Sequence, residues 1–217
     1  MSNQAQLISS DTAYQSLPIH DFFLGRQPIL SRDNQLVAYE LLFRDADTGT
    51  ANVTDNVAAT ASVIAHTAQL GLSNVIGSQL GFINVDADLL NSDVIHFLPK
   101  NKVVLEILET VLATKSLLAR VEELAEAGYR FALDDVVEYS DAVQKLLPLI
   151  PVVKVDISNM EDEHLSRLTR LFKTSGKTLL AEKVETLEQF ERCMQLGFDY
   201  FQGYYFARPT VLTGKKA

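Results

Sequence analysis

The sequence has little of what several protein classes require. A single cysteine, Cys193, excludes a disulfide framework, and its position in a helical pattern indicates a buried structural thiol. No apolar run approaches the roughly 18 residues needed to cross a bilayer. The polar first twenty residues lack the basic and apolar segments of a signal peptide. We therefore expect a cytoplasmic protein that does not enter a membrane.

Positive charge is also scarce. The chain has 19 Lys and Arg residues against 28 Asp and Glu residues, so its formal net charge is −9. No basic stripe is visible beyond the short Lys215-Lys216 tail, and nucleic acid is therefore not expected as a partner. An anionic substrate would need something local and positive, such as metal ions, to hold it.

What the chain does have is a regular alternation of apolar runs. With 217 residues, of which 47% are hydrophobic, it can bury one substantial core. Eight short runs rich in Val, Ile and Phe are predicted strands. They are Phe22–Leu30, Leu36–Arg44, Gly81–Val85, Val103–Leu108, Arg130–Asp135, Val152–Asp156, Leu179–Val184 and Tyr200–Phe206.

Segments with helical spacing lie between these runs. One is expected at Asp55–Leu70, behind the N-cap Thr54, and three further apolar stripes each stop at a glycine: Gly128, Gly176 and Gly197. The order of elements predicts a (β/α)₈ barrel over residues 22–210, between a polar N-terminal extension (1–21) and a short tail (211–217).

The first two predicted strands differ from the rest. The turn around Ser31–Gln35 is too short for a crossover helix, so these strands should form an antiparallel hairpin. A doubly wound open sheet is the structural alternative. No glycine-rich phosphate loop follows any strand, which counts against the nucleotide-binding forms of that fold.

Polar residues recur at the carboxyl ends of the predicted strands. They are Glu40, Asn84, Glu106, Asp134, Asp135, Lys154, Asp156, Glu182 and Gln202. A lone acid at a strand end is most often a helix cap, but in a barrel these ends converge on one mouth. Carboxylates so close together need cations to neutralise them, and oxygen ligands suit Mg²⁺ or Mn²⁺. Two such ions could activate water and stabilise a displacement at phosphorus.

Seven motifs, in order, resemble those of the EAL-domain cyclic di-GMP phosphodiesterases. They are Gln27-Pro28, Tyr39-Glu40-Leu41-Leu42-Phe43-Arg44, Leu105-Glu106-Ile107-Leu108-Glu109, Asp134-Asp135, Lys154-Val155-Asp156, Ala181-Glu182-Lys183-Val184-Glu185-Thr186, and Gln202-Gly203-Tyr204-Tyr205-Phe206 through Pro209. The residues in these motifs are most similar to those of the subgroup in which a compact EAL domain precedes an HDOD domain. The resemblance implies a metal-dependent enzyme of bacterial second-messenger signalling that hydrolyses cyclic di-GMP to linear pGpG.

The resemblance also implies a role for each matched residue. The metal ligands would be Glu40, Asn84, Glu106 and Asp134 for one Mg²⁺ or Mn²⁺ ion, with Asp135 bridging to or holding a second. The catalytic residues would be Glu40, Lys154, which positions the attacking water, and Glu182. Cyclic di-GMP would be contacted by Gln27, Leu42, Arg44, Gln202 and Pro209, with Arg44 on a phosphate. Glu109 would anchor the loop after the fifth strand.

Two departures from the family pattern leave a second function open. The family follows Asp-Asp with Phe-Gly-Thr-Gly-Tyr-Ser-Ser, whereas the segment Val136–Asp141 contains neither glycine. Lys183 replaces a glycine and adds a cation that could compete with a metal ion or bind phosphate. The alternative is therefore a catalytically degenerate domain that binds cyclic di-GMP or a protein partner. The resemblance also allows a homodimer and a C-terminal HDOD domain.

Overall fold

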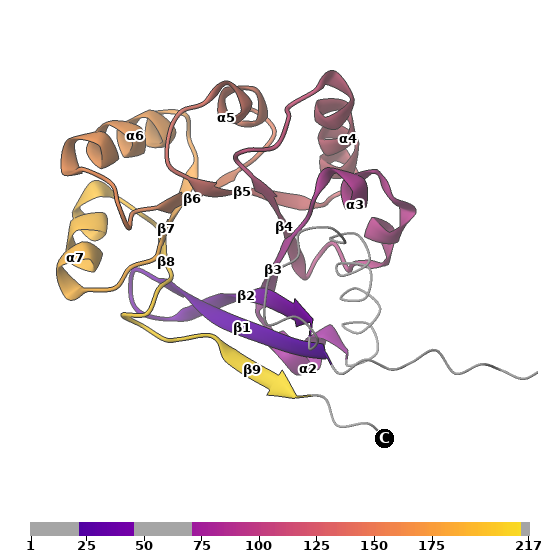
Figure 1. The fold of residues 1–217 in the computed structure, drawn as a ribbon, viewed down its shortest axis with the longest axis horizontal. Helices are drawn as coiled ribbons and strands as arrows, with labels where there is room; N and C mark the ends of the chain where they lie inside the picture. Colours follow the sequence, from indigo (N-terminus) through magenta and orange to yellow (C-terminus); the bar gives the residue numbers. More distant parts are fainter. Residues whose placement is uncertain (1–21, 46–70, 214–217) are drawn as a thin grey trace, which may run out of the picture.

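The computed structural model describes residues 22–45 and 71–213 (Figure 1). The helix expected at Asp55–Leu70 lies outside these residues. The strands are β1 (Phe22–Ser31), β2 (Leu36–Asp45), β3 (Leu80–Asn84), β4 (Val103–Leu108), β5 (Arg130–Val136), β6 (Val152–Asp156), β7 (Thr178–Glu182), β8 (Tyr200–Phe201) and β9 (Thr210–Thr213). The helices are α2 (Leu72–Ile76), α3 (Ala87–Asn91), the 3₁₀ helix η1 (Asp93–Phe97), α4 (Lys115–Glu126), α5 (Asp141–Leu146), α6 (Asp162–Thr174) and α7 (Leu187–Leu196).

The strands close into a barrel. Their order is β2-β3-β4-β5-β6-β7-β8-β1-β9, and the additional pairing of β1 with β2 closes the ring. Each consecutive pair of strands from β2 to β8 is parallel. Strand β1, which lies between β2 and β8, is antiparallel to both. Helices α3 to α7 lie outside the ring (Figure 1). The predicted barrel and its antiparallel hairpin are both confirmed.

The helices begin and end where local chemistry favours it. Thr114 caps α4 by accepting a hydrogen bond from the backbone N–H of Leu117, and Thr186 forms a capping box with Gln189 at the start of α7. The predicted glycine stops are confirmed after α4, α6 and α7. Gly128, Gly176 and Gly197 all have positive φ, a conformation that costs glycine little.

Alternation along the strands separates two apolar regions. One face of each strand packs against the helices in the main core, which includes Leu105, Val121 and Phe172. The other face points into the barrel and forms a smaller cluster made only of strand residues. Its buried members are Ile29, Ala38, Phe82, Val104, Ala132 and Leu180. This inner layer fills the barrel, as layers of strand side chains do in this fold.

Two strands differ from the prediction by more than one residue at an end, and one strand was not predicted. β8 ends at Phe201 rather than Phe206, since residues 203–206 form a turn, and β7 ends at Glu182 rather than Val184 because Lys183 has a φ of 56°. β9 pairs with β1 outside the closed ring. The boundaries of the barrel domain at 22 and 210 stay a prediction. In the described part of the chain, no helix is long and apolar enough to cross a membrane.

Candidate functional site

The polar mouth of the barrel follows directly from the inner apolar layer. Successive side chains on a strand point to opposite faces, so residues two apart share a face. Each apolar residue of the inner layer on five parallel strands is followed two positions later by a polar one. These polar residues are Glu40, Asn84, Glu106, Asp134 and Glu182, and Lys154 occupies the corresponding place on β6. The strand period therefore places them together at one end of the barrel.

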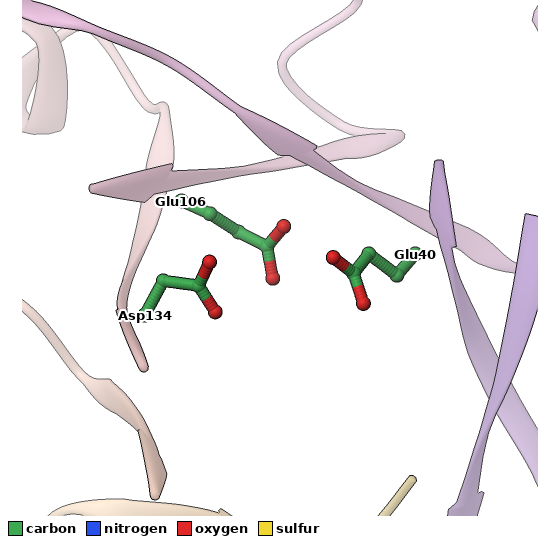
Figure 2. A group of neighbouring side chains, drawn as sticks. All are labelled: Glu40, Glu106 and Asp134. Carbon is green, nitrogen blue, oxygen red and sulfur yellow. The ribbon is translucent and has the colours of Figure 1, made fainter. Parts of the chain in front are cut away.

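Four carboxylates surround the ammonium of Lys154, and we call these five side chains the inner group. Nζ of Lys154 lies 2.6 Å from Asp134 Oδ1, 2.9 Å from Glu182 Oε1 and 3.8 Å from Glu40 Oε2, and it also pairs with Glu106. Lys154 and Glu106 are fully buried. Figure 2 shows three of the carboxylates, those of Glu40, Glu106 and Asp134, pointing toward one another.

Burial dominates the electrostatics of the inner group. It raises the pKa of Glu106, Asp134 and Glu182 above their ordinary values, against the opposing effect of Lys154. Burial alone would lower the pKa of Lys154, but the surrounding carboxylates outweigh it and hold this pKa well above its usual value. Lys154 therefore stays charged, and the raised pKa of three of the four carboxyl groups shows that one ammonium does not offset their burial.

The inner group suits a divalent cation. Ligand oxygens of Glu40, Glu106 and Asp134 all lie within 4.8 Å of one another. Among the described residues, Glu106 Oε2 and Glu182 Oε2 are buried and have no hydrogen-bond partner, which is costly unless something else binds them. An ion would supply both the missing charge and the missing partner. Carboxylate oxygens are the ligands that Mg²⁺, Mn²⁺ and Ca²⁺ prefer.

An irregularity in β5 separates its two adjacent aspartates. Leu133 pairs with Val153 and Val136 with Val155, so that Asp134 and Asp135 together face the single residue Lys154. Such a bulge redirects side chains, and bulges are common at barrel rims. Asp135 has a φ of 51°, which costs a residue other than glycine about 1–2 kcal/mol. As a result Asp134 joins the inner group, whereas Asp135 reaches Lys183 beside it.

Lys183 joins two aspartates at the rim of the mouth. Its Nζ lies 3.0 Å from Asp135 Oδ1 and 2.5 Å from Asp156 Oδ2. Burial opposes ionisation of Asp156, but hydrogen bonds from Lys183 and Ser158 outweigh it and lower the pKa of this carboxyl. The two hydrogen bonds with Asp156 and Asp135 likewise outweigh burial and raise the pKa of Lys183. Asp156 and Lys183 are therefore both charged at neutral pH.

A cavity of about 320 Å³ lies over the inner group and over the neighbouring pair of Asp135 and Lys183. Its lining residues are Gln27, Glu40, Leu42, Asp134, Asp135, Glu182, Lys183, Glu185, Gln202, Gly203 and Tyr204. Gly203 is required at the edge of this cavity because a Cβ there would lie 2.1 Å from the carbonyl oxygen of Val184. This close approach holds the segment after β8 against the segment after β7. The volume is within the range of small-molecule sites.

The structure brings most of the predicted site residues to this cavity. Gln202 donates hydrogen bonds to Glu40 and, over 3.1 Å, to Gln27, while Asn84 is exposed and donates to Glu40 over 3.5 Å. Leu42 lines the cavity wall. Pro209 is half-buried in the segment before β9 and does not line the cavity.

Arg44 and Glu109 are the remaining predicted site residues. The backbone of Arg44 pairs with Phe23, but its side chain lies outside the described residues. Glu109 lines a separate cavity with Val137, Glu138 and Ser140 of the segment after β5, and its backbone N–H donates to the backbone carbonyl oxygen of Asp134. Its Oε2 is buried and has no hydrogen-bond partner among the described residues.

Sequence reasoning assigned no role to three residues at the mouth. Asp156 was noted as a strand-end residue and as part of the Lys154-Val155-Asp156 motif, without a role, yet it pairs with Lys183. Glu185 and Tyr204 line the cavity, and both lie inside motifs that were recognised. Their position directly after matched strand ends was the available signal, but spacing alone could not show which way these side chains point.

The fold and the mouth define a (β/α)₈ barrel domain whose buried carboxylates suit a divalent ion. The model of the EAL domain family matches residues 13–209 of this chain. The chain therefore belongs to the EAL domain family, and the expected relationship is confirmed. The link to an HDOD domain stays a prediction.

Curated relatives and solved structures agree with this assignment. The Vibrio cholerae cyclic di-GMP phosphodiesterase CdgJ is 37% identical over 194 residues, which cover 88% of this chain and 45% of CdgJ. The Bacillus subtilis protein YuxH is 32% identical over 197 residues, covering 88% of this chain and 48% of YuxH. The chain thus spans about half the length of these relatives. The EAL-domain protein YkuI of Bacillus subtilis, in complex with cyclic di-GMP and calcium, has the same fold, with a TM-score of 0.71 and 21% identity over 89% of this chain and 57% of that one.

Proposed function

We propose that this chain is a divalent-metal-dependent phosphodiesterase that hydrolyses cyclic di-GMP to linear pGpG. The observation that carries the proposal is the inner group: four carboxylates from four strands around one fully buried lysine, at the floor of a cavity in an EAL barrel. The 37% identity to the cyclic di-GMP phosphodiesterase CdgJ supports the substrate and the reaction.

The inner group would hold one Mg²⁺ or Mn²⁺ ion through Glu40, Glu106 and Asp134, with Asn84 as a neighbouring ligand. The ligand oxygens already converge, and the buried Glu106 Oε2 lacks a partner among the described residues. The family match and the calcium in the complex of YkuI support a divalent ion. When bound, such an ion lowers the pKa of a bound water and neutralises charge on a phosphoryl oxygen.

Lys154 would hold the attacking water in line with phosphorus. Its Nζ is held by the inner carboxylates and keeps a positive charge beneath the cavity, whose lining includes Glu40, Asp134 and Glu182. Glu182, whose Oε2 is free of other hydrogen bonds in the described part of the chain, would accept a hydrogen bond from that water. In the reaction the water oxygen bonds to phosphorus, the bond from phosphorus to the 3′ oxygen breaks, and that oxygen takes up a proton.

The remaining predicted residues would bind the dinucleotide around this centre. Gln27 and Gln202 are hydrogen-bonded to each other at the cavity wall, and Leu42 adds an apolar contact. We keep Arg44 as the phosphate contact and Pro209 as a contact at the end of the closing motif. Asp135, the predicted bridging residue, pairs with Lys183 at the rim, and Glu109 would support the segment after β5.

The test is turnover with matched variants. The purified chain is incubated with cyclic di-GMP and Mn²⁺ or Mg²⁺, and pGpG is followed by chromatography beside a calorimetric titration in Ca²⁺. We expect metal-dependent product that Glu40→Ala and Lys154→Ala abolish and that Glu123→Ala leaves unchanged. Glu123 is the control because its exposed carboxylate lies on α4, where it pairs with Arg120, and it does not line the cavity. Near-wild-type turnover in both site variants would show that the site is assigned wrongly.

A second candidate function is favoured by the ion pairs of Lys183. An ammonium that already occupies Asp135 and Asp156 weakens a two-metal mechanism, which suits a domain that binds cyclic di-GMP or a protein partner without hydrolysis. Binding in Ca²⁺ without product in Mn²⁺ would establish this alternative. We further propose that the domain acts in the cytoplasm. A homodimer and a C-terminal HDOD or other protein partner stay predictions, which size-exclusion chromatography and the complete gene would test.

A further inference from the structure

A second charged group lies beside the inner group at the rim of the cavity. It consists of Asp135, Asp156 and Lys183, and we call it the outer group. The Lys183 ammonium contacts one oxygen of each aspartate, at 3.0 Å and 2.5 Å. The three residues come from the ends of β5, β6 and β7, which are neighbours in the barrel. The side chain of Lys183 is half exposed and lines the cavity, so a substrate in the cavity would meet its charge.

The backbone of Lys183 is strained in a way that glycine would avoid. Its φ of 56° lies in the left-handed region, which glycine adopts readily and other residues do not. Asp135, its partner, has a φ of 51°. Strain of this kind persists where the surrounding structure requires the residue, and it concentrates at functional sites. What a lysine provides here, and glycine could not, is the pair of contacts with Asp135 and Asp156.

The two groups differ in how far their charge is balanced. The inner group sets one ammonium against four carboxylates, and buried Glu106 and Glu182 oxygens there have no hydrogen-bond partner among the described residues. The outer group sets one ammonium against two carboxylates. A divalent ion bound by Asp135 and Asp156 would have to displace Nζ of Lys183 or lie next to it, where like charges repel.

We propose that the Lys183 ammonium takes the place of a second divalent ion between Asp135 and Asp156, so that this centre binds a single ion, in the inner group. The proposal rests on the proposed function, since it counts the ions of the same centre. It also gives Lys183 a specific role: the ammonium supplies a fixed single positive charge at the rim of the cavity, independent of the metal concentration.

The test counts bound Mn²⁺ rather than turnover. The whole chain is dialysed against Mn²⁺ alone, the bound ions are counted by elemental analysis, and paramagnetic resonance shows whether neighbouring ions are coupled. We expect one ion in the wild type and two coupled ions in Lys183→Gly, with the second ion binding at least about tenfold more tightly than any second ion in the wild type. Lys183→Arg keeps the charge and should stay at one ion. Lys173→Ala is the control because it removes an ammonium that pairs with Asp199 away from the cavity.

Each other outcome overturns the proposal. Two ions in the wild type would show that Lys183 does not exclude the second. One ion in both the wild type and Lys183→Gly, with turnover retained, would overturn this inference and leave the phosphodiesterase intact. No bound ion in the wild type would overturn the proposed function together with the inference, and Glu106→Gln, which should remove the inner ion, identifies the site that was counted.

Discussion

Replacing Lys154 by methionine tests the inner group most directly. The change keeps a side chain of similar length and removes the ammonium that contacts all four carboxylates. Because Lys154 is fully buried, its partners remain as uncompensated charges. Removing one partner of a buried ion pair costs about 3–5 kcal/mol. For a chain of 217 residues, each kcal/mol lowers the Tm by about 2–4 °C, so we expect a Tm decrease of roughly 6–20 °C.

The size of this decrease should depend on pH. Burial already raises the pKa of Glu106, Asp134 and Glu182 in the folded protein, and loss of the ammonium raises each further. A carboxyl with a raised folded pKa binds protons more tightly than in the unfolded chain, so its stability contribution is lost as pH rises toward the folded value. The Tm of Lys154→Met should therefore fall further below that of the wild type at about pH 8 than at about pH 5.

The assay is thermal unfolding of the metal-free protein, followed by circular dichroism at both pH values. Lys173→Met is the matched control because its ammonium, 37% exposed, pairs with Asp199 at the surface. Such pairs contribute at most about 1 kcal/mol. Mn²⁺ should restore part of the lost stability of Lys154→Met, since an ion can neutralise the same carboxylates. If the Tm of Lys154→Met at the higher pH falls no further than that of Lys173→Met, the assignment of Lys154 as a buried lysine paired with four carboxylates is refuted.

Three further predictions follow from particular side chains. Burial raises the pKa of Glu182 to about 8, so the metal-free wild type should lose stability as pH rises from about 4.5 to about 8. Urea unfolding across this range should show a shallower decline for Glu182→Gln, and an unchanged slope would contradict the shift. Gly203→Ala forces a Cβ onto the backbone of Val184 and should lower the free energy of unfolding by about 1–3 kcal/mol, whereas a variant as stable as the wild type would exclude this close packing. Cys193 is buried, which raises its thiol pKa to about 12, so a thiol reagent should label it only in denaturant; rapid labelling of the folded chain would show that it is accessible.

The sequence by itself determined the barrel and which polar residues lie on the inner face of its strands. Strand period is a local property, so a polar residue two positions after an inward apolar one must share its face, as Glu106 does after Val104 and Asp134 after Ala132. The glycine stops are local as well, because positive φ depends on the residue itself. The seven motifs then indicated the family on residue identity alone.

Only the tertiary structure decided which charges meet. Lys154 touches carboxylates from four strands, and its burial and pKa depend on neighbours that are distant in the sequence. The bulge in β5 sends Asp134 and Asp135 to different partners, although they are adjacent in the chain. Lys183 faces Asp135 across 48 residues because β5, β6 and β7 end side by side. Periodicity gives the face on which a side chain lies, whereas contact and electrostatics depend on the packing of the whole barrel.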